Sequence, residues 1–215
     1  MKMTYKTVLK ENRAEMIEKK SRFIASVKPV STEEEALTFL NEIKAEFRDA
    51  THNVYAYIIS ENNICRYSDD GEPGGTAGVP TLDVLRKEGL TDLCVVVTRY
   101  FGGTLLGAGG LVRAYGKSAK LGVLAAKITE KIYCHELKIA ISYDWLGKIR
   151  HIIENGDYIL GDIEYADNVT VTAYIKYDLL DKFLKEVSDA TNASVTPEVT
   201  GEMYIDRILE EKKEQ

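Results

Sequence analysis

Residues 93–113 run Leu93-Cys-Val-Val-Val-Thr-Arg-Tyr-Phe-Gly-Gly-Thr-Leu-Leu-Gly-Ala-Gly-Gly-Leu-Val-Arg113. The first six residues form a short run dominated by apolar side chains, which predicts a strand buried on both faces. From residue 110 to residue 127 the apolar side chains recur at helical spacing. The stretch therefore predicts a buried strand that a glycine-rich connection joins to a helix, and we expect a fold of the α+β class around it.

The chain has 215 residues, of which 45% are hydrophobic and 29% are charged. That length is comfortable for two domains, since single domains cluster at roughly 100–150 residues. The apolar content is high enough for folding to offset the loss of chain entropy. We therefore expect a globular protein with two modest cores.

Charge is unevenly divided along the chain. The net charge is −6, but residues 1–130 hold 18 Lys and Arg against 17 Asp and Glu, whereas residues 131–215 hold 10 against 17. The overall balance argues against a generic nucleic-acid-binding protein, which usually carries a basic excess. The first half nevertheless tolerates an anionic partner, and the second half repels one.

Targeting signals and disulfide patterns are not recognisable. The N-terminal residues alternate charged and apolar side chains without a hydrophobic signal region, and no apolar run is long enough to span a bilayer. Cys65, Cys94 and Cys134 are widely spaced and odd in number, which fits neither a disulfide framework nor a metal motif. We expect a cytoplasmic protein with reduced thiols, no membrane association and no cofactor.

Further elements of the first half follow from periodicity. Strands are expected at residues 5–9, 22–30 and 53–59, which are rich in β-branched and aromatic side chains. Ser31 and Glu34 have the spacing of a capping box and predict the start of a helix. Its buried face is expected to carry Leu37, Leu40, Ile43 and Phe47. A second helix is expected over residues 74–88, with Gly89 as its stop.

A new pattern begins near residue 130. A strand, a helix, a two-stranded hairpin, a second helix and a short final strand follow in order, which is the βαββαβ sequence of a ferredoxin-like fold. We therefore divide the chain into an N-terminal domain of residues 1–128, a ferredoxin-like domain of residues 129–208, and a charged tail of residues 209–215.

Glycine is concentrated in two segments, residues 68–78 and 98–113, which hold nine of the 16 glycines. Such clustering needs a reason, because glycine loses more backbone entropy on folding than any other residue. The second segment leads into a helix N-terminus, where free N–H groups and the helix dipole favour an anion. The candidate anion-binding glycines are Gly102, Gly103, Gly107, Gly109 and Gly110. Tight turns and close helix packing explain the clustering equally well.

Basic side chains accompany the second segment. Arg113, Lys117, Lys120 and Lys127 share one face of the expected helix, and Arg99 directly precedes the glycines. A basic stripe that trails from a helix N-terminus suits a phosphate backbone better than a small molecule. An ordinary solvated helix face is the alternative.

Acidic side chains mark the first segment. Asp69, Asp70 and Glu72 lie within four residues and can chelate a hard cation or act as an acid–base pair. The same Asp-Asp-Gly-Glu-Pro sequence is also typical of a rigid turn. His52 is the one histidine near this region and is a candidate accessory residue, although an isolated histidine is more often structural. Both interpretations of the cluster stay open.

Both segments, Ser68-Asp-Asp-Gly-Glu-Pro-Gly-Gly-Thr-Ala-Gly78 and Arg99-Tyr-Phe-Gly-Gly-Thr-Leu-Leu-Gly-Ala-Gly-Gly-Leu111, resemble the signature of the IMPACT/YigZ family. The resemblance also includes Lys19-Lys-Ser-Arg-Phe-Ile24 and Asp49-Ala-Thr-His52, and it covers most of residues 1–125. It implies a first domain similar to domain 2 of ribosomal protein S5 and a second similar to the C-terminal domain of elongation factor G.

The resemblance also implies a role connected with translation. Its eukaryotic members regulate translation by competing for the activator of the kinase that acts on initiation factor 2, but that activity belongs to members with a different appended domain and is not carried over. Similarity to two ribosome-associated folds is an analogy at the level of the fold.

Three functions remain to be separated. The leading expectation is a non-enzymatic protein that binds RNA or the ribosome and regulates translation, with Arg99, Arg113 and Lys117 as phosphate contacts. The second is an enzyme that acts on a phosphorylated small molecule held by the glycine loops. The third is a protein-interaction module. A small ligand that binds the native state would raise the melting temperature and so favour the enzyme.

Overall fold

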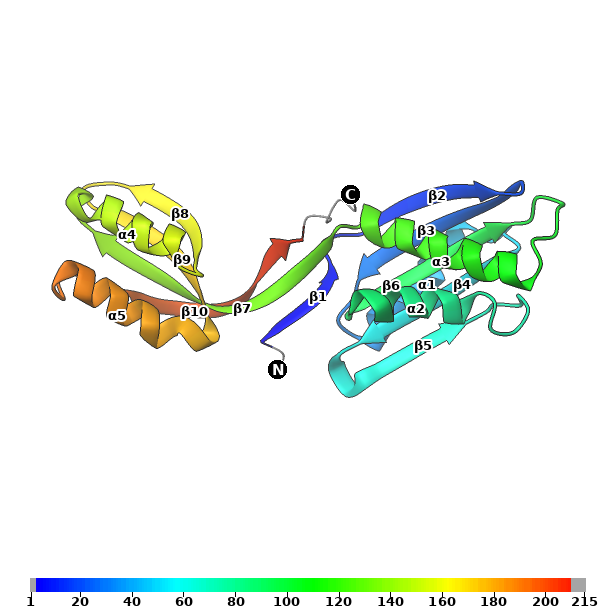
Figure 1. The fold of residues 1–215 in the computed structure, drawn as a ribbon, viewed down its shortest axis with the longest axis horizontal. Helices are drawn as coiled ribbons and strands as arrows, with labels where there is room; N and C mark the ends of the chain where they lie inside the picture. The colour runs from blue at the N-terminus through cyan, green and yellow to red at the C-terminus, as the bar shows by residue number, and fades with distance from the viewer. Residues whose placement is uncertain (1–2, 210–215) are drawn as a thin grey trace. The chain divides into compact units, whose positions relative to one another are not determined.

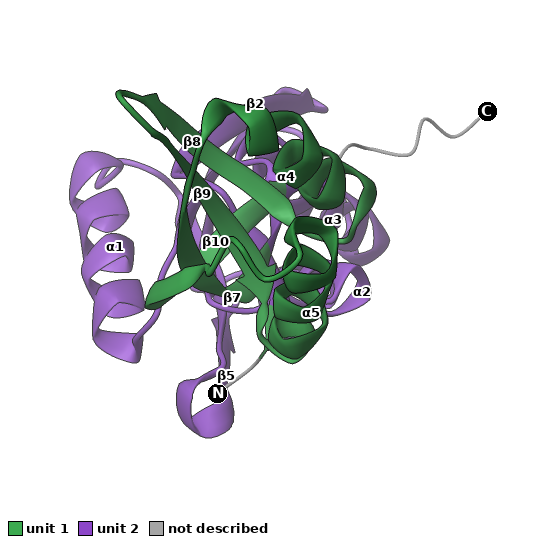
Figure 2. Cartoon of the chain, turned by 90° about the vertical axis from the view of Figure 1, so that its left-hand side faces the viewer, with its two compact units in different colours: residues 1–4, 131–207 green, residues 5–130, 208–215 purple. Residues whose placement is uncertain are grey.

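A computed structural model describes residues 3–209 of the chain. It divides into two compact units, which we call the N-terminal unit (residues 5–130 and 208–209) and the C-terminal unit (residues 3–4 and 131–207), purple and green in Figure 2. Except for Leu209, the charged tail expected at residues 209–215 lies outside the described residues. Within residues 3–209, no helix is both long and apolar enough to cross a membrane.

A five-stranded antiparallel sheet forms the middle of the N-terminal unit, in the order β2-β3-β6-β4-β5. The strands are β2 (Asn12–Glu18), β3 (Ser21–Pro29), β4 (His52–Ile59), β5 (Ile64–Ser68) and β6 (Leu93–Tyr100). Helix α1 (Glu33–Glu46) covers one face, and helices α2 (Gly78–Glu88) and α3 (Ala108–Ala125) cover the other (Figures 1 and 2). A short 3₁₀ turn (Glu61–Asn63) links β4 to β5.

The central strand β6 is buried on both faces, as its apolar run predicts. Val95 and Val97 pack into the core shared with α2 and α3, while Cys94 and Val96 pack into the core under α1. This division follows the two-residue period of a strand. Helix α3 approaches the sheet closely at Gly122, where an added Cβ would lie 2.7 Å from the Cβ of Ala25. The glycine thus fixes α3 against β3.

Helix α1 begins one residue later than expected. The capping box joins Thr32 to Glu35, so the prediction of Ser31 and Glu34 is wrong by one position. The Glu35 carboxylate also accepts a 2.6 Å hydrogen bond from the Ser31 N–H. Leu40 and Ile43 are buried as predicted and Phe47 is partly buried, whereas Leu37 is 43% exposed and Ala36 and Phe39 complete the buried face.

Two strands of this sheet were not expected from periodicity. They are β2 and β5, the edges of the sheet. Side chains of β2 alternate between exposed and partly buried, β5 has no fully buried side chain, and neither strand presents an apolar run. Helix α2 begins at Gly78 rather than at residue 74, because residues 69–77 form a turn. Gly89 ends α2 with a left-handed φ of 68°, as expected.

The C-terminal unit has the element order βαββαβ that its sequence predicts. The elements are β7 (Ile128–Ile141), α4 (Tyr143–Asn155), β8 (Ile159–Tyr165), β9 (Val169–Lys176), α5 (Leu180–Thr191) and β10 (Glu198–Ile208). The strands lie in the order β8-β9-β7-β10, and β7 also pairs with β1 (Thr4–Val8). Apolar side chains of β7 and β9 pack against both helices around Ile149, Phe183 and Val187. Residues 3–209 therefore form an α+β protein with three apolar clusters, one on each face of the N-terminal sheet and one in the C-terminal unit, rather than the two cores expected.

Candidate anion-binding site

A buried ion pair joins the two glycine-rich segments. The Arg99 guanidinium donates a 2.5 Å hydrogen bond from Nη1 to Oε1 of Glu72, and the Tyr115 hydroxyl donates to the same oxygen at 2.8 Å. The Arg99 and Glu72 side chains are 6% and 4% exposed. Burial, followed by the charge of Glu72, raises the pKa of Tyr115, so its hydroxyl keeps its proton and remains a donor. The two segments therefore lie side by side.

Arg99 has a structural role instead of the expected contact with phosphate. Its Nη2 donates to Oγ of Ser21 at 3.3 Å, and its guanidinium lies 5.4 Å from the centre of the Phe23 ring. A side chain that is almost fully buried and already neutralised by a carboxylate cannot reach a phosphate without breaking that pair. In this structure the Arg99 side chain is therefore held within the fold and is not exposed toward an anion.

Asp69 caps helix α2 from a distance. Its carboxylate accepts hydrogen bonds from the N–H groups of Gly75, Ala77 and Gly78 at 2.9, 3.0 and 2.8 Å. Helix α2 has no side-chain cap at Ala77, so Asp69 supplies the acceptor that the helix start needs. Burial alone would raise the pKa of Asp69, but the three N–H donors outweigh it and hold the pKa below its ordinary value.

The remaining members of the acidic cluster face other partners. Asp70 accepts a 2.6 Å hydrogen bond from the Asn53 N–H and lies 3.3 Å from Nζ of Lys44. His52 places Nδ1 2.7 Å from the Asp70 carbonyl and Nε2 3.8 Å from Oε1 of Glu72. Among residues 3–209 no group of three His, Cys, Asp or Glu side chains is arranged to hold a metal ion. Asp69, Asp70 and Glu72 thus stabilise a turn and do not converge on a common ligand.

Gly102 lets the turn between β2 and β3 pack closely against the second glycine-rich segment. A Cβ at Gly102 would lie 2.0 Å from the carbonyl carbon of Lys20, so only glycine allows this approach. The turn itself consists of Lys19 and Lys20, with φ angles of 44° and 67°. Two left-handed residues are typical of a type I′ hairpin, which favours Asn-Gly rather than two lysines. The lysines therefore hold a strained conformation directly above the glycine loop.

The other candidate glycines lie at the start of α3. Gly103 and Gly107 have left-handed φ angles of 78° and 72°. Gly107 is the N-cap of α3 and offers no side-chain acceptor to the helix, and Gly109 and Gly110 belong to its first turn. The first N–H groups of a helix have no partner within the helix, so this end of α3 attracts negative charge.

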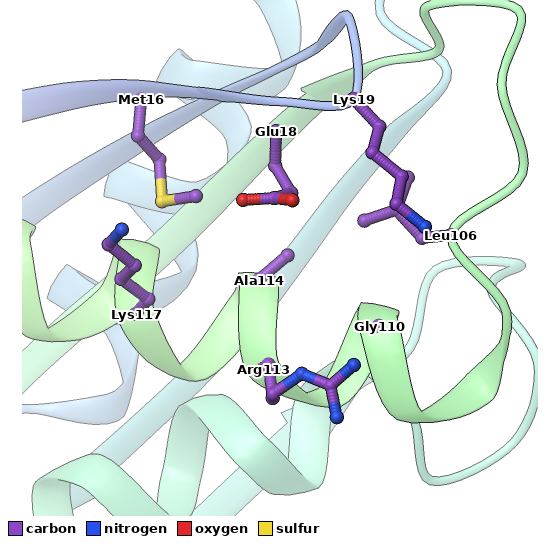
Figure 3. Close-up of a pocket in the computed structure, with 8 residues that line it drawn as sticks. All are labelled: Met16, Glu18, Lys19, Leu106, Gly110, Arg113, Ala114 and Lys117. Carbon is purple, nitrogen blue, oxygen red and sulfur yellow. The ribbon is translucent and has the colours of Figure 1, made fainter.

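A cavity of about 210 Å³ lies between β2 and α3. Figure 3 shows the Met16, Glu18 and Lys19 side chains directed from β2 and its turn toward α3. The lining residues are Met16, Glu18, Lys19, Leu106, Gly110, Arg113, Ala114 and Lys117. The floor is apolar and the rim is charged, which suits a partner that has both an apolar and an anionic part.

Only part of the basic stripe of α3 lines this cavity. Arg113 and Lys117 line it together with Lys19, and in the described part of the chain these three side chains have no ion pair. Lys120 lies 3.9 Å from Glu88, and Lys127 follows the end of α3. Met16 and Glu18 were not foreseen, because β2 was not recognised as a strand. The run of two lysines before Ser21 was the available signal for Lys19.

Comparisons with known proteins cover both units. The family described as the Impact N-terminal domain matches residues 19–123, and a domain of unknown function, DUF1949, matches residues 139–194. The IMPACT family member YvyE of Bacillus subtilis is 41% identical over 212 residues, which are 98% of each chain. The IMPACT family member YigZ of Escherichia coli is 31% identical over 180 residues, covering 82% of this chain and 88% of YigZ.

One solved structure resembles the whole chain. It is described as a hypothetical protein, has 28% sequence identity and a TM-score of 0.59, and the match covers 93% of this chain and 98% of the other. The similarity thus extends through both units and does not by itself assign an activity.

Proposed function

The chain belongs to the IMPACT family, and on this premise we propose that it is a non-enzymatic protein that binds RNA, free or in the ribosome, through its N-terminal unit and so regulates translation. The observation that carries the proposal is the set of three unpaired cations around the cavity, Lys19, Arg113 and Lys117. Cations without protein partners are free to neutralise phosphates and release counterions.

The location of these cations supports a polymeric partner. Lys19 lies on the hairpin turn, and Arg113 and Lys117 lie one helical turn apart on α3, so the three charges come from two separate elements that face one cavity. The cavity is smaller than the roughly 300–1,000 Å³ that pockets for whole small ligands occupy. It therefore suits one part of a larger chain better than a complete phosphorylated substrate.

The proposal is tested by titrating fluorescently labelled single-stranded RNA with the full chain at two salt concentrations. Three phosphate contacts on a single strand predict a slope of log K against log salt of about −2. Charge reversal in Arg113→Glu or Lys117→Glu should lower the affinity for all sequences alike, because phosphate contacts do not read bases.

Lys120→Glu provides the matched control, since Lys120 lies on the same helix but faces Glu88 rather than the cavity. Its reversal should change the affinity much less. Undetectable binding at low salt, or equal affinity in all three variants and the wild type, would contradict the proposal. In that case, stabilisation by a phosphorylated small molecule would favour an enzyme instead.

A further inference from the structure

Phosphate binding leaves one residue of the cavity unexplained. Glu18 is half-buried at the end of β2, and within the described residues its carboxylate has no hydrogen bond and no ion pair. A carboxylate beside a phosphate site weakens phosphate binding by repulsion. A carboxylate is also an acceptor with no proton to donate, so a ligand that satisfies Glu18 must offer N–H or O–H donors.

The cavity floor describes the rest of the ligand. Met16, Leu106 and Ala114 present apolar surface, and Leu106 packs closely over Gly110, where an added Cβ would lie 3.0 Å from the Leu106 Cβ. Leu106 is only 9% exposed, so this floor is part of the packed core and not a mobile surface. The thioether of methionine makes favourable contacts with aromatic rings. A flat aromatic group therefore fits the floor.

The volume limits how much of the ligand enters. At about 210 Å³ the cavity holds roughly seven water volumes at about 30 Å³ each. One ring system fits this space, and the sugar and phosphates of a nucleotide would remain at the rim beside Lys19 and Lys117. Figure 3 shows Lys117 extending upward from α3 and Lys19 downward from the turn, on either side of Glu18.

We propose that the cavity receives one guanine base of a single-stranded RNA, and that Glu18 accepts hydrogen bonds from N1–H and N2–H of that guanine. This inference rests on the function proposed above. Among the four RNA bases only guanine presents two adjacent N–H donors on its Watson–Crick edge, which match the two oxygens of a carboxylate. Unstacked bases of single strands are read on this edge by many RNA-binding proteins.

The inference divides the work of the site between two sets of side chains. The cations contact phosphates and set the affinity for any RNA, whereas Glu18 selects the base and sets the preference. Loss of Glu18 therefore changes specificity without changing the salt dependence, and loss of a cation does the reverse.

The test compares labelled oligouridine strands that carry guanine, inosine, adenine or cytosine at one central position, titrated with the full chain. Guanine should bind about tenfold more tightly than adenine or cytosine, as a bidentate contact to a base provides. Inosine lacks the N2 amino group, so its affinity should lie between those of guanine and adenine.

The variant Glu18→Gln should abolish the preference for guanine and slightly raise the affinity for plain oligouridine, because a negative charge beside the rim cations is removed. Glu61→Gln is the matched control. Glu61 is exposed in the turn between β4 and β5, at the opposite edge of the sheet from β2, and has no ion pair among the described residues. This variant should keep the full preference.

Each outcome separates the two proposals. Salt-dependent binding that is equal for all four bases, or a guanine preference that survives in Glu18→Gln, overturns the guanine inference and leaves RNA binding intact. Absence of binding to every strand overturns both. Binding of free guanosine monophosphate as tightly as the guanine strand would assign the cavity to a free nucleotide and overturn the RNA inference.

Discussion

Arg99 and Arg113 stand at the two ends of one glycine-rich segment, yet they have opposite environments. Arg99 is buried against Glu72 and Tyr115, whereas Arg113 is exposed on α3 with no ion pair among the described residues. The same contrast separates the two motif segments. In residues 68–78 the acidic side chains bind partners within the fold, whereas the cations Arg113 and Lys117 have no hydrogen bond or ion pair among the described residues.

Charged residues of the two motif segments meet different requirements, depending on whether they are buried or exposed. A buried charge must be paired, because an unpaired charge inside a protein is costly. An exposed cation on a surface has no such requirement and is available to a partner. The residues that make the motif recognisable are therefore divided between a scaffold and a binding surface, and four experiments can test the division.

The largest effect is expected from Glu72→Ala. The substitution leaves Arg99 buried without its carboxylate and removes the acceptor of Tyr115, and loss of one partner of a buried pair typically costs about 3–5 kcal/mol of unfolding free energy. Urea denaturation measures it. Glu15→Ala is the control, since Glu15 pairs with Arg22 on the surface at 2.8 Å and water replaces that contact. Equal losses in the two variants would contradict the scaffold role.

A smaller loss is expected from Gly102→Ala. The new Cβ would collide with the backbone of Lys20, so the hairpin turn must shift, at a cost of about 1–3 kcal/mol. Gly74→Ala serves as the control because no atom lies within 4 Å of its added Cβ and its φ is not positive. The free energy of unfolding of that variant should lie within about 0.5 kcal/mol of the wild-type value. If Gly102→Ala leaves the free energy of unfolding unchanged, the conformation of the turn does not depend on this glycine.

A pH-dependent loss is expected from Asp69→Asn. Its lowered pKa means that Asp69 stabilises the fold above the ordinary carboxyl range and that this contribution disappears as the pH falls through the folded-state pKa. The variant should therefore lose about 0.5–2 kcal/mol at pH 7 and much less at pH 3, as urea denaturation at both values would show. Asp83→Asn, on α2 but without a hydrogen bond in the described residues, should show no such change.

The smallest expected change in stability is a gain rather than a loss. Replacing Lys19 and Lys20 by Asn and Gly gives the turn the residues that a type I′ hairpin prefers and should raise stability by about 0.5–1 kcal/mol. The same change removes a rim cation and should weaken RNA binding. Thermal unfolding and the RNA titration measure the two effects on one protein. A gain in stability with unchanged affinity would remove the lysine turn from the binding surface.

Much of the fold was predictable because its central elements carry strong periodic signals. The apolar run of β6 and the alternating pattern of β9 can both be recognised as strands in the sequence. The edge strands β2 and β5 do not, since their stability comes from pairing with a neighbour. The register of the α1 cap was ambiguous for a different reason. Ser31 and Thr32 are both followed three residues later by a glutamate, and only the backbone geometry selects Thr32.

The site was predictable only in part. The sequence indicated Arg113 and Lys117 because they share a helix face, but the burial of Arg99 against Glu72 was not foreseen. A signal was available, since Arg99 is in phase with Val95 and Val97 on β6 and therefore points to the core shared with α3. Glu18 and Met16 belong to an unrecognised strand, so no local pattern could place them opposite α3.

The shared oxygen of Glu72 has a consequence for local motion. Because Oε1 binds Arg99 of β6 and Tyr115 of α3 together, residues 69–77 cannot lift from the sheet without exposing two buried polar groups at once. A loop tied in this way opens with the elements that hold it and not by itself. The N–H groups of Gly75, Ala77 and Gly78, which donate hydrogen bonds to Asp69, should therefore exchange their protons with solvent as slowly as those of the central strand, although Gly75 itself is exposed.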